Sequence, residues 1–375
     1  MSRKAASACG QPAVPRRNRR DPKALQYSSI AGALARWFSA NARDLPWRRN
    51  RQPWKSLVSE ALLQQTQVAR VAERFPEFMR RFPTPRAMVK AGPSAVLEAW
   101  RGLGYYRRAR SLHAAAERIV AVHGGQVPSD MRALLELPGV GRYTAGAVAS
   151  IVFGQHQPIV DGNVARVLSR LADRRASVAD REGQSWCWEQ ATQLVKAAKD
   201  PGATNEALME LGATVCTPMQ PRCGACPLRD MCGARAAGSQ DEVPPPKPGA
   251  VVKRVVHHAL VQIRDGRVAL ERRTEGLWSG LLAPPSVETL RAISCRQVQA
   301  LSGASTVARA IARFDFQTTH RRVHFIVHPA SFPEDRPLQW VPLRRLGSVA
   351  IASAGLRVVE AARGQGAPRA ARLRA

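Results

Sequence analysis

The chain has 375 residues, of which 45% are hydrophobic and 23% are charged, so it is long enough to form two domains with cores of their own. Lysine and arginine number 57 against 28 acidic residues, and the net charge of +29 favours a polyanionic partner without choosing among DNA, RNA and a membrane surface. The sequence contains no signal peptide and no uncharged apolar run near the ~20 residues of a membrane span, so we expect a cytoplasmic protein.

The first part of the chain is predicted to be helical. Residues 1–22 are basic and lack the amphipathic pattern of a transit peptide, so we interpret them as a disordered tail. From residue 23 to 236 apolar residues recur at spacings of three and four, which is typical of helices. The clearest helices are expected at 57–82, 95–100, 109–123, 131–137 and 143–153.

A change of pattern divides the chain. Residues 237–250 include three consecutive prolines and are predicted to form an extended linker. From 251 to 362 the hydrophobic period becomes two, which predicts a smaller α+β domain with a hairpin turn at Asp265-Gly266. A second hairpin is expected to join 312–317 to 323–328, and residues 363–375 are predicted to be a basic tail.

A proline- and glycine-rich turn separates two of the expected helices. Pro138 ends the first helix, and Gly139 and Gly141 permit a tight reversal with positive φ. The free backbone N–H groups that begin the second helix would form an anion site, suited to a DNA phosphate. An ordinary corner between helices is the alternative interpretation. Asp161 follows the second helix and is placed to cap the next one.

Four cysteines lie within one segment of 17 residues, with six, two and five residues between them. This compact spacing favours a [4Fe–4S] cluster over zinc, which prefers paired cysteines set well apart. Disulfides are not expected in a chain without a secretion signal. The four predicted ligands are Cys216, Cys223, Cys226 and Cys232.

One expected helix combines an acid with a block of amides. Gln64, Gln65 and Gln67 are suited to contact base edges or to fill the space of a displaced base, although a solvated helix face is the simpler interpretation. Glu60 lies in an apolar stretch, and burial there would raise its pKa and keep a proton available near neutral pH. A protonated Glu beside an ionised Asp161 is an arrangement that cleaves glycosidic bonds.

These features occur together in one order, and the chain therefore resembles the helix-hairpin-helix DNA glycosylases that carry a [4Fe–4S] cluster. Within them it is most similar to the MutY adenine DNA glycosylases. The stretches that carry the resemblance are 44–48, 59–68, 102–106, 137–143, 160–164, 205–208 and the four cysteines.

The resemblance implies a mainly α, two-lobed glycosylase domain over residues 23–236, with the cluster loop at 216–232, followed by a Nudix-like domain. It implies base excision repair by a monomer without membrane contact, associated with the nucleoid. The expected substrate is double-stranded DNA containing adenine mispaired with 8-oxoguanine or guanine, from which the adenine is excised.

The resemblance also implies residue roles. Glu60 would protonate the adenine and later activate water, and Asp161 would stabilise the sugar cation, with Tyr143 and Asn163 in support. Other residues would line the adenine pocket or enter the DNA duplex where the base is flipped out. The pocket residues are Trp47, Arg48 and Glu206, those entering the duplex are Gln65 and Tyr105, and those anchoring the DNA backbone are Gly139 and Gly141.

Position 143 separates two related activities. Enzymes similar to endonuclease III place there a lysine that forms a Schiff base and cleaves the strand. This chain has Tyr143, so we expect a monofunctional glycosylase. The alternatives are a bifunctional pyrimidine glycosylase/lyase and a non-catalytic iron–sulfur protein that binds DNA.

The second domain resembles the Nudix-like domain with which MutY proteins recognise 8-oxoguanine. It lacks a glutamate-rich Nudix box, so Mg²⁺-dependent hydrolysis is not expected. The family's Phe-Ser-His recognition loop corresponds to Thr318-Thr319-His320. Thr319 can supply the hydroxyl and His320 the imidazole, whereas Thr318 cannot stack as phenylalanine does.

Overall fold

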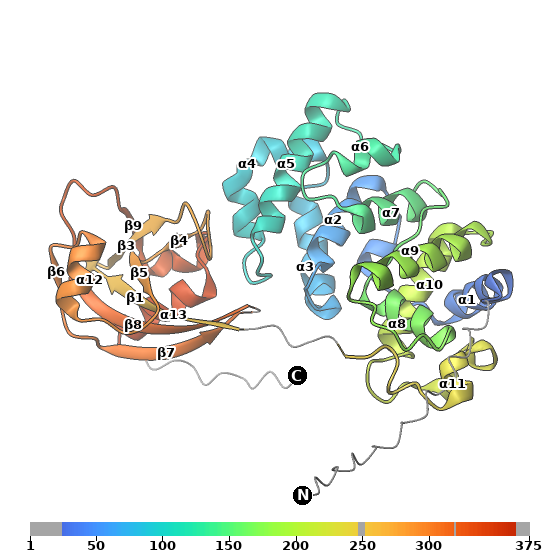
Figure 1. Ribbon diagram of the computed structural model, residues 1–375. Helices are drawn as coiled ribbons and strands as arrows, with labels where there is room; N and C mark the ends of the chain where they lie inside the picture. The colour runs from blue at the N-terminus through green and yellow to red at the C-terminus, as the bar shows by residue number, and fades with distance from the viewer. Residues whose placement is uncertain (1–24, 247–251, 319, 365–375) are drawn as a thin grey trace, which may run out of the picture.

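The structure is a computed structural model, and it describes residues 25–246, 252–318 and 320–364. The predicted tail at 1–22, most of the tail predicted at 363–375, the end of the predicted linker and Thr319 lie outside the described residues. Helices occupy the chain up to residue 237, and strands begin at residue 253, so the predicted order of a mainly α part and a smaller α+β part is confirmed (Figure 1).

The helical region contains eleven α-helices among its described residues. They are α1 (Tyr27–Asn41), α2 (Pro53–Leu63), α3 (Val68–Arg81), α4 (Pro85–Ala99), α5 (Arg107–Val122), α6 (Met131–Leu135), α7 (Arg142–Ile151), α8 (Gly162–Leu171), α9 (Arg181–Lys196), α10 (Pro201–Thr214) and α11 (Gly233–Ala237). Short 3₁₀ turns lie at Pro46–Arg48, Cys223–Ala225 and Arg229–Met231.

These helices form two hydrophobic cores. One gathers side chains of α2 to α7, including Leu57, Trp100 and Val148, and the other gathers side chains of α1 and α8 to α10. In α8 the buried Val164, Val167 and Leu168 fall on one face, as the spacing of three and four predicts. The two cores give the helical region two lobes.

The prediction of one helix over 57–82 is wrong, because α2 ends at Leu63 and α3 begins at Val68. Arg108 donates hydrogen bonds to the carbonyl oxygens of Ala61 (3.0 Å) and Leu62 (2.9 Å), which would otherwise accept from the next turn of α2. The amide block lies in the connection between the helices, and Gln65 there has a φ of +54°.

The second region is built on two sheets. Its elements are β1 (Lys253–Val261), β2 (Ile263–Arg264), β3 (Arg267–Arg272), β4 (Leu282–Ala283), β5 (Ser286–Thr289), α12 (Cys295–Ser302), β6 (Thr306–Val307), β7 (Ala312–Gln317), β8 (Arg321–Ser331), β9 (Gln339–Pro342), a 3₁₀ turn (Leu343–Ser348) and α13 (Ser353–Ala362). The larger sheet has the order β5-β1-β8-β6, with β7 paired to β8, and the smaller has the order β2-β3-β4, with β9 paired to β3. Strands β1 and β8 are parallel, with Val255 opposite Val323.

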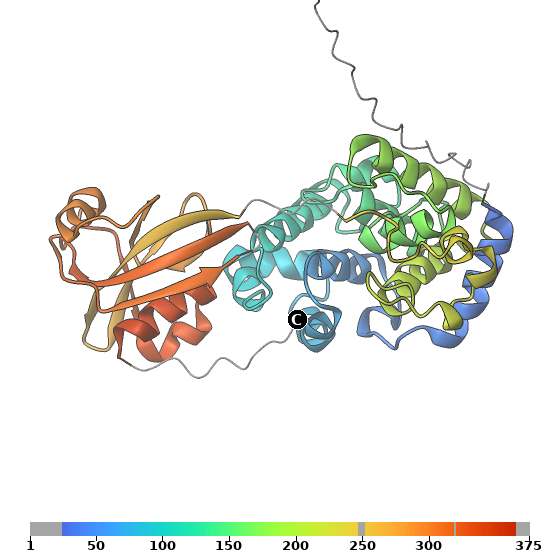
Figure 2. The same cartoon turned by 60° about the horizontal axis from the view of Figure 1, so that its bottom comes forward.

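Both predicted hairpins are confirmed. Asp265 (φ +49°) and Gly266 (φ +69°) form the turn between β2 and β3, and β7 pairs antiparallel with β8. Helix α13 packs on this sheet, and Val358 and Val359 are buried in its core. The second region lies beside α4 and α5 of the helical region (Figure 2).

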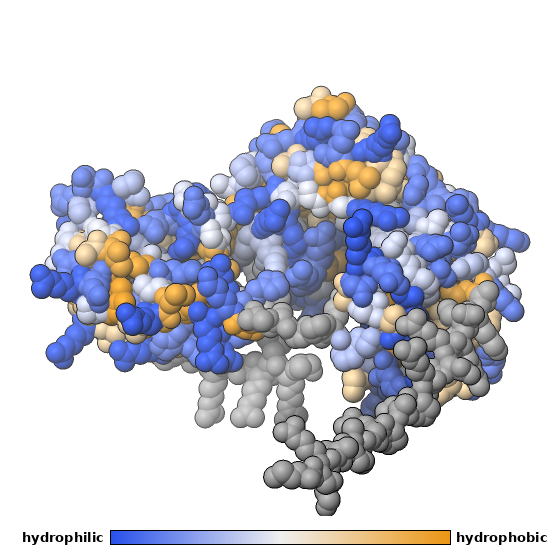
Figure 3. Space-filling view, viewed as in Figure 1, coloured by the Kyte–Doolittle hydropathy of each residue, from blue (hydrophilic) through white to orange (hydrophobic). Residues whose placement is uncertain are grey.

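The face of the molecule drawn in Figure 3 is mostly hydrophilic, and hydrophobic residues appear on it in small patches. Within the described ranges no helix is long and apolar enough to cross a membrane.

The proline- and glycine-rich turn joins α6 to α7. Gly139 has a φ of +78°, as predicted, and a Cβ there would lie 2.5 Å from Ser111 Cβ on α5. The prediction of positive φ at Gly141 is wrong, because its φ of −96° and ψ of 179° are extended values of a helix N-cap. Of the two glycines in this turn, only Gly139 is therefore required to be glycine by both conformation and space.

Replacing Gly139 by alanine is expected to destabilise the fold by about 1–3 kcal/mol, because the new methyl group strains the backbone and displaces α5. Gly141→Ala is the matched control, since its Cβ would meet no atom within 4 Å; we expect a cost below about 1 kcal/mol. Urea unfolding of both variants measures the difference, and equal costs would contradict the assigned geometry.

Candidate active site

A cavity of about 260 Å³ lies between the two helical lobes. It is slightly smaller than the ~300–1,000 Å³ of pockets that hold drug-sized ligands, so it suits one small ring system. Its lining includes every residue that the sequence analysis assigned to catalysis and to the base pocket. These residues are Trp47, Arg48, Glu60, Tyr143, Asp161, Asn163 and Glu206.

Glu60 is a buried acid on α2, with 7% of its surface exposed. Burial raises its pKa from 4.5 to about 7, the charges of Glu206 and Asp161 act in the same direction, and a hydrogen bond with Tyr143 opposes them. Its Oε2 atom has no hydrogen-bond partner among the described residues. Glu60 therefore holds a proton near neutral pH and faces a cavity in which that proton can be donated.

Asp161 is the N-cap of α8. Its Oδ1 accepts a hydrogen bond from the Val164 N–H (2.7 Å), and its Oδ2 accepts one from Asn163 Nδ2 (3.0 Å). Both oxygens of the Asp161 side chain are therefore held in place by the first turn of α8. The two predicted roles of Asp161, as helix cap and as cavity carboxylate, therefore coexist in one geometry.

Two arginines that the sequence analysis did not assign to the site connect Asn163 to the cysteine segment. Arg166 donates from Nη2 to Asn163 Oδ1 (2.9 Å) and from Nε to the Cys216 carbonyl oxygen (2.8 Å). Arg170 donates from Nη1 to Cys216 Sγ (3.3 Å). Their spacing of four residues on the polar side of α8 is the only sequence signal for this connection.

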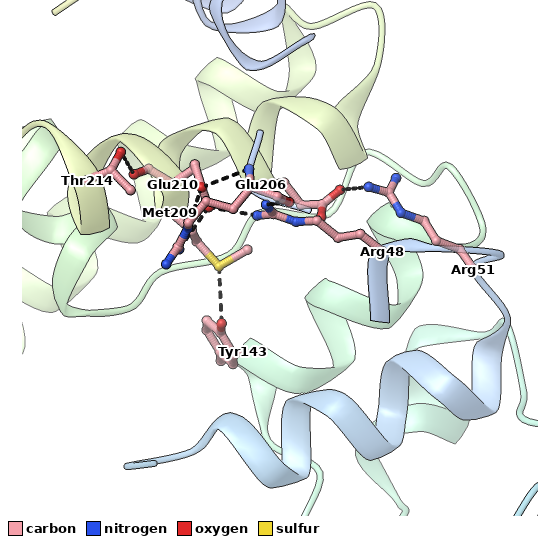
Figure 4. Close-up of polar contacts among 8 residues, drawn as sticks. Arg48, Arg51, Tyr143, Glu206, Met209, Glu210 and Thr214 are labelled. Atoms are coloured by element: carbon pink, nitrogen blue, oxygen red, sulfur yellow. Dashed lines mark hydrogen bonds and ion pairs between the residues drawn. The ribbon is translucent and has the colours of Figure 1, made fainter. Parts of the chain in front are cut away.

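A chain of alternating charges forms one wall of the cavity (Figure 4). Arg48 donates to Glu206 Oε1 (3.1 Å) and to Glu210 Oε2 (2.9 Å), Arg51 pairs with Glu206 Oε2 (2.5 Å), and Arg43 donates to Glu210 Oε1 (2.6 Å). Sequence reasoning missed Arg43, Arg51 and Glu210, although Glu206 and Glu210 are one turn apart on α10.

The two glutamates of this wall titrate differently. Burial raises the pKa of Glu206, and the Arg51 and Arg48 charges only partly offset this effect. Burial also acts on Glu210, but hydrogen bonds from Arg43 and Arg48 outweigh it and lower its pKa. Glu210 is thus the anion that holds the arginines. Glu206 is the glutamate of this pair that is available to contact a group bound in the cavity.

Tyr143 lies at the start of α7, between Glu60 and Met209. Its hydroxyl donates to Met209 Sδ (3.2 Å; Figure 4), and burial raises its pKa well above 10. The side chain therefore stays a neutral hydroxyl. Trp47 lines the cavity as well, and its ring packs edge-on against Phe75, with 5.8 Å between the ring centroids.

A second hollow of about 410 Å³ lies on the other side of α2. Gln65, Tyr105 and Gly139 line it, together with Arg107 and Arg108. Tyr105 is 40% exposed and has a φ of +47°, which is uncommon for a bulky residue. The structure thus divides the predicted residues between two hollows, and Gly141 lines neither of them.

The four predicted cysteine ligands surround one small hollow of about 20 Å³, together with Arg170, Arg229 and Arg235. Burial raises the pKa of Cys226 to about 11, and the charges of the other three cysteines act in the same direction. The structure thus brings the four predicted ligands together around one site. No three His, Cys, Asp or Glu side chains of the described ranges are grouped as ligands of a single ion.

The predicted recognition loop of the second region is a turn between β7 and β8. Thr318 Oγ1 donates to the Arg321 carbonyl oxygen (3.0 Å), and the His320 carbonyl oxygen accepts from the Lys253 N–H (3.0 Å). The His320 side chain is exposed. The structure does not bring His320 into either hollow of the helical region.

Fold and site define the class of protein. Residues 58–189 match the family model described as the HhH-GPD superfamily base excision DNA repair protein. The chain is also similar to the solved structure of a thermostable thymine-DNA glycosylase, with a TM-score of 0.51, 27% sequence identity and coverage of 56% of this chain and 97% of that one.

Relatives of known activity show to which family within this superfamily the chain belongs. The chain is 46% identical over 238 residues to the adenine DNA glycosylase of Mycobacterium tuberculosis (strain ATCC 25618 / H37Rv), covering 61% of this chain and 77% of the relative. It is 43% identical over 227 residues to the adenine DNA glycosylase of Homo sapiens, covering 58% of this chain. The chain belongs to the adenine DNA glycosylase family. It spans 41% of the length of the human relative.

Glu60→Gln is expected to raise the free energy of unfolding by about 3 kcal/mol at pH 8 and by much less at pH 5. The figure converts the rise of the Glu60 pKa from 4.5 to about 7 at ~1.36 kcal/mol per pKa unit. A carboxyl with a higher pKa in the folded state destabilises the fold as it ionises. The cost is therefore absent below pH ~4.5 and complete above pH ~7. Denaturant unfolding at both pH values measures it.

Glu77→Gln, a change at an exposed carboxylate on α3, is the control, and we expect it to alter stability by less than about 0.5 kcal/mol at either pH. A Glu60→Gln variant whose stability relative to wild type does not change between pH 5 and pH 8 would show that Glu60 is not the buried, raised-pKa acid of this cavity.

Proposed function

We propose that this protein is a monofunctional DNA glycosylase that excises adenine mispaired with 8-oxoguanine or guanine in base excision repair. The observation that carries the proposal is the pairing, in one small cavity, of a buried acid with a pKa of about 7 and a capped carboxylate. Duplex DNA is the partner, and the protein acts in the cytoplasm at the nucleoid as a monomer.

The proposed reaction breaks the N-glycosidic bond between the adenine and C1′ of the sugar. Glu60 donates its proton to the departing base, the bonding electrons leave with the base, and Asp161 stabilises the cation at C1′. The Glu60 carboxylate then accepts a proton from water as the water oxygen bonds to C1′. Asn163 holds Asp161 in place, and the Tyr143 hydroxyl hydrogen bonds to Glu60.

The wall opposite Glu60 is suited to recognise the base. Glu206 accepts hydrogen bonds from the exocyclic amine of adenine, and Arg48 keeps that carboxyl oriented. Trp47 supplies an apolar ring at the side of the cavity. These three residues would discriminate adenine from bases that lack a donor at this position.

The second hollow is suited to the duplex from which the base is flipped. Gln65 and Tyr105 occupy its rim and would fill the gap left in the base stack. The exposed start of α7, with Gly139 and Gly141 in the preceding turn, would bind a phosphate through backbone N–H groups. The net charge of +29 supports a DNA partner.

We assign the four cysteines as ligands of a [4Fe–4S] cluster. When bound, the cluster supplies a covalent cross-link of segment 216–232, which presents Arg222 and Arg229 toward phosphates.

The division of the chain into a glycosylase domain at 23–236, a linker at 237–250 and a Nudix-like domain at 251–362 is part of the same proposal. The last of these would read 8-oxoguanine through Thr319 and His320.

The central test measures adenine release from duplexes with 8-oxoguanine or guanine opposite the adenine, with alkaline cleavage to reveal abasic sites. We expect release by the wild type and a loss of about 10²–10⁴-fold in Glu60→Gln, because general acid catalysis is removed. The wild-type rate should fall about tenfold per pH unit above pH ~7, since Glu60 must be protonated.

Glu73→Gln on the exposed side of α3 is the control for that test and is expected to keep the wild-type rate. Release that is undiminished in Glu60→Gln would overturn the proposed mechanism. Borohydride trapping on a duplex with an oxidised pyrimidine would favour the bifunctional alternative, which Tyr143 disfavours. Salt-dependent binding without turnover would favour the non-catalytic one.

Purified protein is expected to be brown and to absorb near 400 nm, because four thiolates bind iron in a cluster. Cys226→Ala should abolish the absorbance, whereas Cys187→Ala, at a buried cysteine outside the hollow, should keep it. A colourless protein that contains zinc would contradict the cluster assignment.

A further inference from the structure

The second region contacts the helical region through the loop of residues 274–281, between β3 and β4. Arg110 of α5 donates a hydrogen bond from Nη1 to the Ser279 carbonyl oxygen. Gly280 has a φ of +83°, and a Cβ at this position would overlap the same nitrogen. A guanidinium from one region is thus enclosed by the backbone of the other.

The loop that accepts Arg110 is held by hydrogen bonds of its own. Arg272 Nη1 donates to the Gly280 carbonyl oxygen (2.8 Å), and the Gly280 N–H donates to the Arg273 carbonyl oxygen (2.6 Å). Ser279 Oγ donates to the Thr274 carbonyl oxygen (2.8 Å). The Ser279 carbonyl is therefore presented to Arg110 in a fixed direction.

Trp278 extends this contact into both cores. Its ring stacks on Phe325 of β8 at 5.9 Å, lies edge-on to Phe316 of β7 at 6.0 Å, and also packs against the core of α2 to α7. Leu281 is fully buried in that same helical core. The φ of +64° at Trp278 is a strained value for a bulky residue, of the kind that persists where surrounding contacts hold it.

On the helical side the contact leads to the second hollow. Arg108, two residues before Arg110, lies 5.6 Å above the Tyr105 ring and donates to the Gly104 carbonyl oxygen (3.2 Å). It also ends α2 beside Gln65. The first turn of α5 therefore carries both the arginine that docks the second region and the arginine that braces the hollow proposed to receive the duplex.

We propose that Arg110 is a positioning residue for recognition of the base opposite the adenine. It holds loop 274–281, and through Trp278 the strands β7 and β8, at a set distance from Tyr105. The turn that carries His320 joins those two strands, so its reach toward the opposite base depends on this docking. The inference rests on the proposed function and concerns selectivity rather than the chemical step.

Arg110→Ala tests the proposal through the ratio of kcat/KM for adenine opposite 8-oxoguanine to that for adenine opposite guanine. We expect the ratio to fall about tenfold or more, because a hydrogen bond from a charged group is lost, while the rate opposite guanine stays within about twofold. Gly280→Ala should lower the ratio similarly, and the double variant should fall no further than either single one. Arg110→Lys should recover part of the ratio.

Arg118→Ala is the matched control, since Arg118 lies on the same helix and pairs with Glu136 away from the second region; it should keep the wild-type ratio. An unchanged ratio in Arg110→Ala, or an equal decline on both substrates, overturns the inference. A wild type that releases no adenine from either duplex instead overturns the proposed function on which the inference rests.

Discussion

The site depends on the burial of carboxyl groups in one small cavity, which Glu60, Asp161 and Glu206 line together. Burial raises the pKa of Glu60 and of Glu206, and the charges of Glu206 and Asp161 raise that of Glu60 further. Asp161 is held by two hydrogen bonds at the N-terminus of α8, and Glu206 faces two arginines. Glu60 hydrogen bonds to Tyr143, but burial outweighs this bond and raises the pKa of Glu60 to about 7.

Two further sets of contacts in the helical region hold these carboxyl groups in place. Glu210 holds Arg43 and Arg48 in the wall, and Arg48 also pairs with Glu206. Arg166 and Arg170 tie the cap of α8 to Cys216, which makes the geometry of Asp161 dependent on the folding of the cysteine segment. The proposed catalytic geometry and the proposed cluster thus depend on the same contacts of α8.

Two separate contacts bring the second region to the helices, one apolar and one charged. Trp278 and Leu281 bury surface in the helical core, which supplies most of the attraction. Arg110 adds direction, because a guanidinium donates along fixed N–H directions to a carbonyl oxygen. An apolar contact has no preferred direction, so alone it would allow the second region to slide along the helical region.

The sequence by itself determined the helical region, both hairpins and the compact segment of four cysteines, because these depend on local periodicity, turn residues and spacing. The pairing of Glu60 with Asp161, about a hundred residues apart, followed instead from the resemblance to a known family. It did not predict the break after Leu63, since Arg108 ends α2 from a distant helix. Nor did it predict Arg43, Arg51 or Glu210, whose pairing joins segments about 160 residues apart. Only the tertiary structure placed Gln65 and Tyr105 in a hollow apart from Glu60, because burial and charge balance arise from packing between helices that no local pattern records.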